Sequence, residues 1–239
     1  MNYLLDNPDA ERIYQEILLK IKRLQNRDVV ISMQKRGIAY KVNFGVSIPL
    51  LQGIASEYPQ NHLVALKLWN KQWRETMILA TLLEVPAEVT ENQIDFWVKN
   101  LQSVEIAEQA AMNLFSKTGF AYQKAFEYCI SKKLLTKITG LLTIGRLALT
   151  DRSAPDENFD PFLELMSPLS RDSQLATVFS RIFIQIGMRN TNLHELVIRH
   201  ATILKTIDSE VSLNNSQLIL NELDCEEVRE IVSRRQQGI

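Results

Sequence analysis

Apolar residues recur at helical spacing from the beginning of the chain. Ile13, Ile17, Ile21 and Leu24 follow one another at intervals of four, four and three residues. This spacing places the four side chains on one face of an α-helix, with polar residues on the opposite face. It predicts a first amphipathic helix that begins near Asp9.

Further short helices, joined by turns of a few residues, are predicted along most of the chain. A stretch of β-branched and aromatic residues between two glycines, 37–47, interrupts them, and we expect an extended connection there. After it, Ser47 can cap a helix that has Pro49 in its first turn. The expected helices cover 26–36, 47–58, 61–71, 72–85, 90–101, 104–115, 120–131, 133–149, 175–186, 192–207 and 216–235.

The rhythm of these helices favours a repeat architecture. Paired helices return at a period of roughly 35 to 45 residues, as in HEAT-type repeats. We therefore expect an all-α fold, a curved stack of paired antiparallel helices (an α-solenoid) that forms a single domain over 1–239. The longest break, 150–161, is acidic and contains two prolines, which predicts an exposed loop between two sub-stacks.

Composition limits the class of protein and its compartment. The chain has 8 glycines and 7 prolines in 239 residues, too few for a loop-rich or disordered protein, and no apolar run approaches the length of a membrane span. Its two cysteines, Cys129 and Cys225, lie far apart in the sequence. These observations predict a soluble, cytoplasmic protein without disulfides and without a membrane partner.

Charge is balanced overall but unevenly distributed. Lys and Arg number 27 and Asp and Glu 28, yet 117–152 holds seven basic and two acidic residues, whereas 84–116 holds one basic and six acidic. Two interpretations stay open: the segments are solvated helix surfaces of clustered sign, or the basic segment binds a polyanion.

Several kinds of chemistry have no candidate residues. Glycine-rich phosphate loops are absent, and His194 and His200 are six residues apart, which on a helix does not bring them together as a metal pair. We therefore expect no metal and no cofactor. Glu105 and Glu108 are interpreted as solvated acidic residues. Trp69 and Trp73, one turn apart in a helical pattern, are expected to anchor the core together.

Two polar stripes point to a phosphodiester backbone. Between Lys132 and Arg146, basic and threonine side chains recur along one helical row, opposite an apolar row. Lysine neutralises phosphate charge, and hydroxyl groups donate hydrogen bonds to phosphate oxygens. A second stripe follows the acidic loop at a strict spacing of four. The predicted DNA-binding residues are Lys132, Lys133, Lys137, Thr139, Thr143, Arg146, Arg181, Gln185 and Arg189.

Several strings resemble the AlkD-like DNA alkylation repair family, whose members are HEAT-like helical-repeat proteins. The similarity covers about 29–190. It is carried by the strings at 45–47, 54–55, 66–83 and 94–101, and it continues into the helix 179–189. The resemblance implies a helical repeat that holds duplex DNA, alkylated or distorted.

The resemblance also implies a catalytic site that is degenerate in this chain. Glycosylases of the family excise cationic alkylated purines with an aspartate, an arginine and tryptophans. Here Glu108 matches the aspartate, Lys137 matches the arginine, and no tryptophan matches. Because the aromatic walls that hold a cationic base are missing, we expect DNA binding with N-glycosylase activity weak or lost.

Two alternatives remain. The protein could be an active alkylpurine DNA glycosylase whose aromatic residues come from elsewhere, such as Trp97 or Tyr122. It could instead be a protein-interaction scaffold without DNA, which uses the acidic segment 84–116 to engage a basic partner.

Overall fold

A computed structural model of the protein describes residues 7–236, and every regular element in that range is a helix. The chain divides after Gly119 into two compact units, which we describe separately. Within the described residues, no helix is both long enough and apolar enough to cross a membrane.

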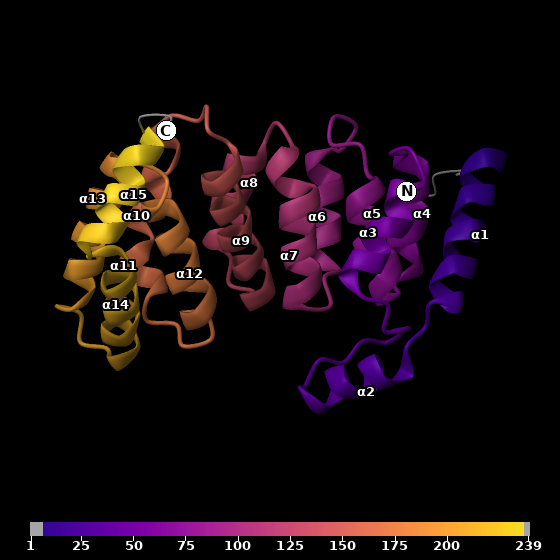
Figure 1. Ribbon diagram of the computed structural model, residues 1–239, viewed down its shortest axis with the longest axis horizontal. Coiled ribbons are helices and arrows are strands. Elements are labelled where there is room, and N and C mark those ends of the chain that lie inside the picture. Colours follow the sequence, from indigo (N-terminus) through magenta and orange to yellow (C-terminus); the bar gives the residue numbers. More distant parts are fainter. Residues whose placement is uncertain (1–6, 237–239) are drawn as a thin grey trace. The chain divides into compact units, whose positions relative to one another are not determined.

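The first unit is built around one short buried helix. Nine of the ten residues of α5 (Arg74–Leu83) are buried, because α3, α4 and α7 all pack against it. Side chains of Asn7, Asn26, Asn61, Thr90 and Ser103 cap five of the helices. The other elements are α1 (Pro8–Arg23), α2 (Arg27–Lys35), α3 (Ile48–Ser56), α4 (His62–Lys71), α6 (Glu91–Lys99), α7 (Val104–Asn113) and the 3-10 turn η1 (Phe115–Lys117) (Figure 1).

The tryptophans of this unit do not pair as expected. Trp69 is fully buried and stacks on Trp97, with ring centroids 4.1 Å apart and planes at 1°. Trp73 lies beyond the end of α4, because Gln72 adopts a left-handed conformation (φ 57°) that turns the chain into α5. The expectation that Trp69 and Trp73 share one core face is therefore wrong.

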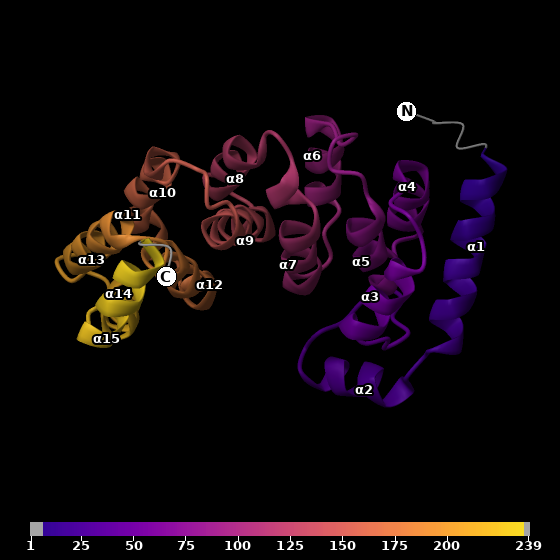
Figure 2. The ribbon, with the colours of Figure 1, turned by 45° about the horizontal axis from the view of Figure 1, so that its top comes forward.

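The second unit is organised around the longest helix, α9 (Leu134–Thr150), which packs against α8 (Ala121–Cys129) and α12 (Ala176–Gly187). Gly140 brings α9 close to Ala125 and Cys129 of α8, and Gly145 brings it close to Ile182 of α12. The remaining helices are α10 (Asp160–Glu164), α11 (Met166–Leu169), α13 (Thr191–Leu204), α14 (Glu210–Leu223), α15 (Glu226–Gln236) and the 3-10 turn η2 (Asp156–Asn158) (Figure 2).

Most expected helices are present, but the second unit differs from the expectation in several places, and α10 and α11 form where no helix was expected. The segment expected as one helix over 216–235 forms two, because α14 begins earlier, after its cap Ser209, and ends at Leu223. The stretch 150–161 is mostly exposed and lies inside this unit, although Phe159 within it is buried. Trp69, Ile78, Ile138, Phe179 and Ile182 are buried in the core, while Ile13, on the apolar face predicted for the first helix, is half-buried, as is Leu66.

Candidate nucleic-acid interface

The basic side chains at the two ends of α9 reach the surface of the second unit. Lys132 and Lys133, just before the helix, are exposed, and Arg146 near its end is partly exposed. None of the three forms an ion pair within the described part of the chain. On α12, Arg181 is exposed as well.

The threonines of the same row do not reach the surface. Thr139 and Thr143 are at most 2% exposed, and their hydroxyls donate to the carbonyls of Leu135 (2.7 Å) and Thr139 (2.8 Å). Because α8 and α12 both approach α9 closely, the helix is covered where a polar stripe was expected. This structure therefore contradicts the assignment of Thr139 and Thr143 as phosphate-binding hydroxyls.

Two other predicted contacts are partly occupied inside the unit. Lys137 is half-buried, and its Nζ lies 3.3 Å from Asp172 Oδ2. Gln185 is half-buried, and its side-chain oxygen lies over Gly145 of α9. Lys137 would have to leave Asp172, and Gln185 would have to leave Gly145, before either side chain could contact a phosphate.

Arg189 is a structural residue and not a surface cation. It is 8% exposed, and its Nη2 donates to the carbonyl of Ala154 at 2.6 Å, while Nη1 donates to the carbonyls of Asp151 and Ala148. Its guanidinium also lies over the ring of Phe159. The assignment of Arg189 to DNA is corrected for this reason: the side chain, just beyond the end of α12, holds the stretch 151–159 in place.

The predicted catalytic residues belong to different units. Glu108 is half-buried on α7 of the first unit, and Lys137 is on α9 of the second. The aromatic residues considered as substitutes are engaged elsewhere. Trp97 is 1% exposed in the stack with Trp69, and Tyr122 packs edge-on against Phe159 and donates to Asp151 at 3.2 Å.

Sequence reasoning missed a cluster of charged side chains buried in the first unit. Arg74 forms a two-pronged pair with Glu105, with Nε to Oε2 at 2.8 Å and Nη2 to Oε1 at 2.6 Å. Its Nη1 donates to Glu75 (3.2 Å) and to the carbonyl of Val46 (2.8 Å), and Tyr40 donates its hydroxyl to Glu105. Glu105 is thus not a solvated acid, contrary to expectation.

Hydrogen bonds and charge keep Glu105 ionised. Burial raises the pKa of Glu105, but hydrogen bonds from Arg74 and Tyr40 and the charge of Arg74 outweigh it, so the pKa lies below its ordinary value. Burial raises the pKa of Tyr40, and its bond to Glu105 acts in the same direction. The sequence signal for the cluster was the pair Arg74-Glu75 at the head of an otherwise apolar helix.

An aromatic and basic group lies beside the cluster. Trp73, half-buried at the start of α5, contacts Phe44 with ring centroids 4.8 Å apart. The ammonium groups of Lys71 and Lys22 lie 4.9 Å and 5.8 Å from its ring centroid. The quadrupole of an aromatic ring attracts a cation over its face, so the two ammonium groups are held beside Trp73.

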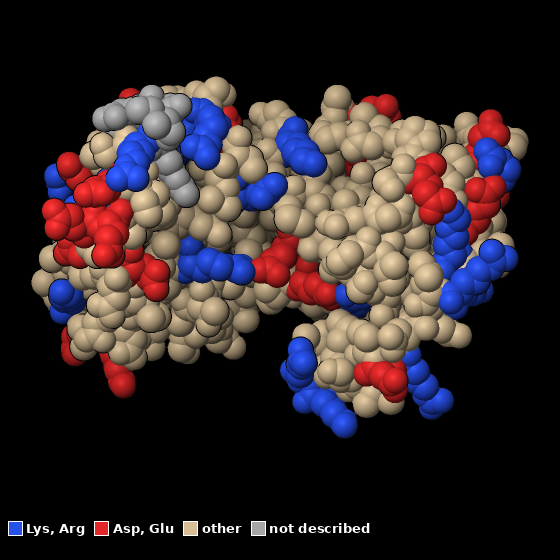
Figure 3. Space-filling model, viewed as in Figure 1, with Lys and Arg blue, Asp and Glu red and all other residues tan. Residues whose placement is uncertain are grey.

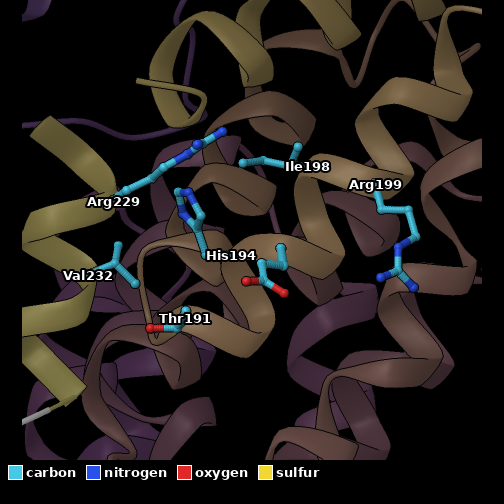
Figure 4. A pocket seen from close by; sticks show the side chains of 7 residues that line it. Thr191, His194, Ile198, Arg199, Arg229 and Val232 are labelled. Atoms are coloured by element: carbon cyan, nitrogen blue, oxygen red, sulfur yellow. The ribbon is translucent and has the colours of Figure 1, made fainter. Parts of the chain in front are cut away.

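The second unit also contains a hollow of about 370 Å³ between α13 and α15 (Figure 4). His194 is 3% exposed, its Nδ1 lies 3.1 Å from the carbonyl oxygen of Gly187, and its Nε2 has no partner among the described residues. In the neutral tautomer that donates to this carbonyl, Nε2 is an acceptor. The lining residues are Thr191, His194, Glu195, Ile198, Arg199, Arg229 and Val232.

No group of three or more His, Cys, Asp or Glu side chains within 7–234 could hold a metal ion. His194 and His200 both lie on α13, where His194 is turned to the carbonyl of Gly187.

Comparison with known proteins identifies the fold. No family model matches the sequence, and no curated protein matches it. The chain is similar to the solved structure of a protein from a family described as related to the HEAT-like repeat DNA glycosylases and as having affinity for branched DNA structures. The TM-score is 0.72 over 88% of this chain and 95% of that chain, at 15% identity. The expected all-α, HEAT-like repeat class is thus confirmed.

Proposed function

We propose that this protein binds DNA, holding a damaged, distorted or branched duplex through its basic side chains, and that its N-glycosylase activity is weak or lost. The HEAT-like fold supports the proposal, since the structural neighbour is described as having affinity for branched DNA. So do the basic residues that reach the surface of the second unit.

The observation that carries the proposal is the set of cations along α9. Lys132, Lys133 and Arg146 are accessible and have no ion-pair partner within the described residues. With a rise of about 1.5 Å per residue, the helical segment from Leu134 to Arg146 spans roughly 18 Å. Phosphates of one DNA strand follow one another about every 3.4 Å along the helix axis, so this length corresponds to about five phosphates. The two ends of α9 can therefore contact separate phosphates of one backbone.

Weak or absent base excision is supported by the state of the aromatic residues. Cleavage of a cationic base requires a carboxylate and aromatic surfaces that hold the cation. The indole of Trp97 is enclosed by its stack with Trp69, so it offers no accessible face to a base. Binding of the phosphate backbone by lysine and arginine does not need these aromatic surfaces.

The protein-scaffold alternative has less support. Of the acidic residues in 84–116, Glu84 is fully buried and hydrogen-bonds to His62 at 2.7 Å, and Glu105 is bound to Arg74. Both carboxylates are used internally, which reduces the acidic surface available to a basic partner.

Salt-dependent DNA binding tests the proposal. Log affinity for a duplex should fall linearly with log salt, with a slope of about −0.9 per phosphate contact. In the variant K132A/K133A/R146A the slope should flatten by about 2 to 3 units. The matched control K117A/R171A/K205A removes three other exposed cations and should leave the slope closer to that of the wild type. Absence of wild-type binding at low salt would contradict the proposal.

Catalysis is tested separately by single-turnover release of 7-methylguanine from duplex DNA. We expect release far below that of an active alkylpurine glycosylase from the wild type and from Glu108→Gln alike. Rapid release by the wild type that Glu108→Gln abolishes would establish an active glycosylase with Glu108 as its carboxylate.

A further inference from the structure

A basic arm projects from the helices of the first unit. It runs from Arg27 to Asn43 and consists of α2 and the extended connection that follows it. No residue of α2 is buried, whereas every other α-helix of this unit buries at least two. Both ribbon views show α2 standing apart from the other helices of the unit (Figures 1 and 2).

The arm carries a strong positive charge. It holds four basic residues against one acidic residue, Asp28, and all four basic side chains are exposed. None of them forms an ion pair within the described residues. The four are Arg27, Lys35, Arg36 and Lys41, and Figure 3 shows basic side chains gathered on this element.

The neck of the arm is closed by backbone contacts. The amide of Asn26 donates to the carbonyl of Phe44 at 2.7 Å, which joins the chain where it leaves and where it returns. Gly45 has φ +73°, and a Cβ at this position would lie 2.2 Å from the carbonyl oxygen of Asn26. Only glycine permits this approach, so the two ends of the arm are fixed against each other.

The returning segment is held by the buried cluster of charges. Glu75 accepts hydrogen bonds from the amides of Phe44 (3.1 Å) and Val46 (3.3 Å), and the amide of Arg74 donates to the carbonyl of Val42 at 3.0 Å. Tyr40, within the arm, also contacts Ser103 of the core at 2.6 Å. The buried cluster around Arg74 and Glu75 therefore fixes the segment by which the basic arm returns to the unit.

We propose that this arm is a second DNA-binding site, at which Lys35, Arg36 and Lys41 contact the phosphate backbone. The inference rests on the proposed function and adds a contact site on the first unit. Charge complementarity identifies the partner, because three unpaired cations meet a polyanion that releases counterions when they bind. A fixed arm loses little conformational entropy on binding. Lys22 and Lys71, held over Trp73 beside Phe44 at the neck, extend the positive surface.

The test compares the full-length wild type with K35A/R36A/K41A, using a four-way DNA junction as the probe over a range of salt concentrations. The arm variant should flatten the slope of log affinity against log salt by about 2 to 3 units and bind about 10-fold or more weakly at 0.1 M salt. K117A/R171A/K205A is the matched control and should change the slope less. Since the three arm residues are exposed and unpaired, the thermal midpoint should stay within about 2 °C of the wild type.

The outcomes separate the two proposals. A wild type that binds no DNA contradicts the proposed function itself. If the wild type binds the junction and the arm variant has the same affinity and salt dependence as the control, only the assignment of the arm as a DNA site is overturned. Binding of anionic phospholipid vesicles that the arm variant loses, with DNA binding unchanged, would assign the arm to a membrane surface and also overturn it.

Discussion

Each unit contains a segment that leaves its helices and is held back by a buried arginine, but the partners differ. In the first unit Arg74 anchors the return of the basic arm, and its partners include two carboxylates, Glu75 and Glu105. In the second unit Arg189 anchors 151–159, and its hydrogen bonds go to backbone carbonyls of Ala148, Asp151 and Ala154.

This difference determines what happens when one partner is lost. A buried ion pair that loses one member leaves an uncompensated charge, which is costly in a low-dielectric interior. Arg189 also has one carboxylate nearby, with its Nε 3.9 Å from Asp156 Oδ1, but Asp156 keeps hydrogen bonds from Asn190 and Asn192 when the arginine is lost. The carbonyl groups that lose Arg189 are neutral dipoles, and those near the surface can turn to water. Loss of a partner of Arg74 should therefore lower the free energy of unfolding more than loss of the hydrogen bonds of Arg189.

The largest expected effect follows from removing Glu105. Glu105→Ala leaves Arg74, whose side chain is 4% exposed, without its two-pronged partner. Glu75 still lies 3.2 Å from Arg74 Nη1 and compensates part of its charge, so we expect the free energy of unfolding, measured by urea denaturation, to fall by about 2 to 4 kcal/mol. Glu88→Ala, at an exposed position, is the control and should change it by less than about 0.5 kcal/mol. A loss below about 1 kcal/mol would mean that water enters and compensates Arg74.

A smaller effect is expected from Arg189→Met, which keeps much of the side-chain volume and removes the donors. The free energy of unfolding should fall by about 1 to 3 kcal/mol. Amide hydrogen exchange should accelerate mainly in 151–159, where the anchored carbonyls lie. Exchange that accelerates equally throughout α12 and α13 would show that Arg189 supports the whole unit and not this segment.

The smallest effect is a pH dependence. Because the pKa of Glu105 in the folded protein lies below its ordinary value of 4.5, its ionised form stabilises the fold above pH 4.5, and this contribution is lost as the pH falls through the lowered value. The stability difference between the wild type and Glu105→Gln should therefore shrink on acidification below pH 4.5. Burial raises the pKa of Glu84, but this residue is present in both proteins, so its contribution to the pH dependence cancels in the difference. A difference that stays constant with pH would contradict the ionised pair.

The helices could be predicted from the sequence because they depend on local spacing and local caps. Helices α4 and α6 begin where expected, after Asn61 and Thr90, whose side chains each accept a hydrogen bond from an amide only three residues ahead. Ser47, the expected cap, does precede α3, but its side chain makes no capping hydrogen bond. The class of fold followed from the rhythm of these helices.

The sites were harder to predict because burial of a polar side chain depends on partners distant in sequence. Glu105 meets Arg74 from 31 positions away, and Arg189 meets carbonyls 35 to 41 positions away. A helical row such as that of Thr139 and Thr143 shows which side chains share a face of α9, but not that α8 and α12 cover it. The sequence also does not show which glycines allow helices to approach closely, as Gly140 and Gly145 of α9 do.

The placement of the tryptophans has an optical consequence. All three, Trp69, Trp73 and Trp97, precede Gly119 and belong to the first unit. The stacked pair should give an exciton couplet in circular dichroism, and Trp73, under two ammonium groups beside the neck of the arm, is the indole most exposed to quenching by a bound ligand. Intrinsic indole emission thus follows the first unit alone, while far-ultraviolet ellipticity follows the helices of both. If the two signals change at different denaturant concentrations, the units unfold as separate cooperative bodies.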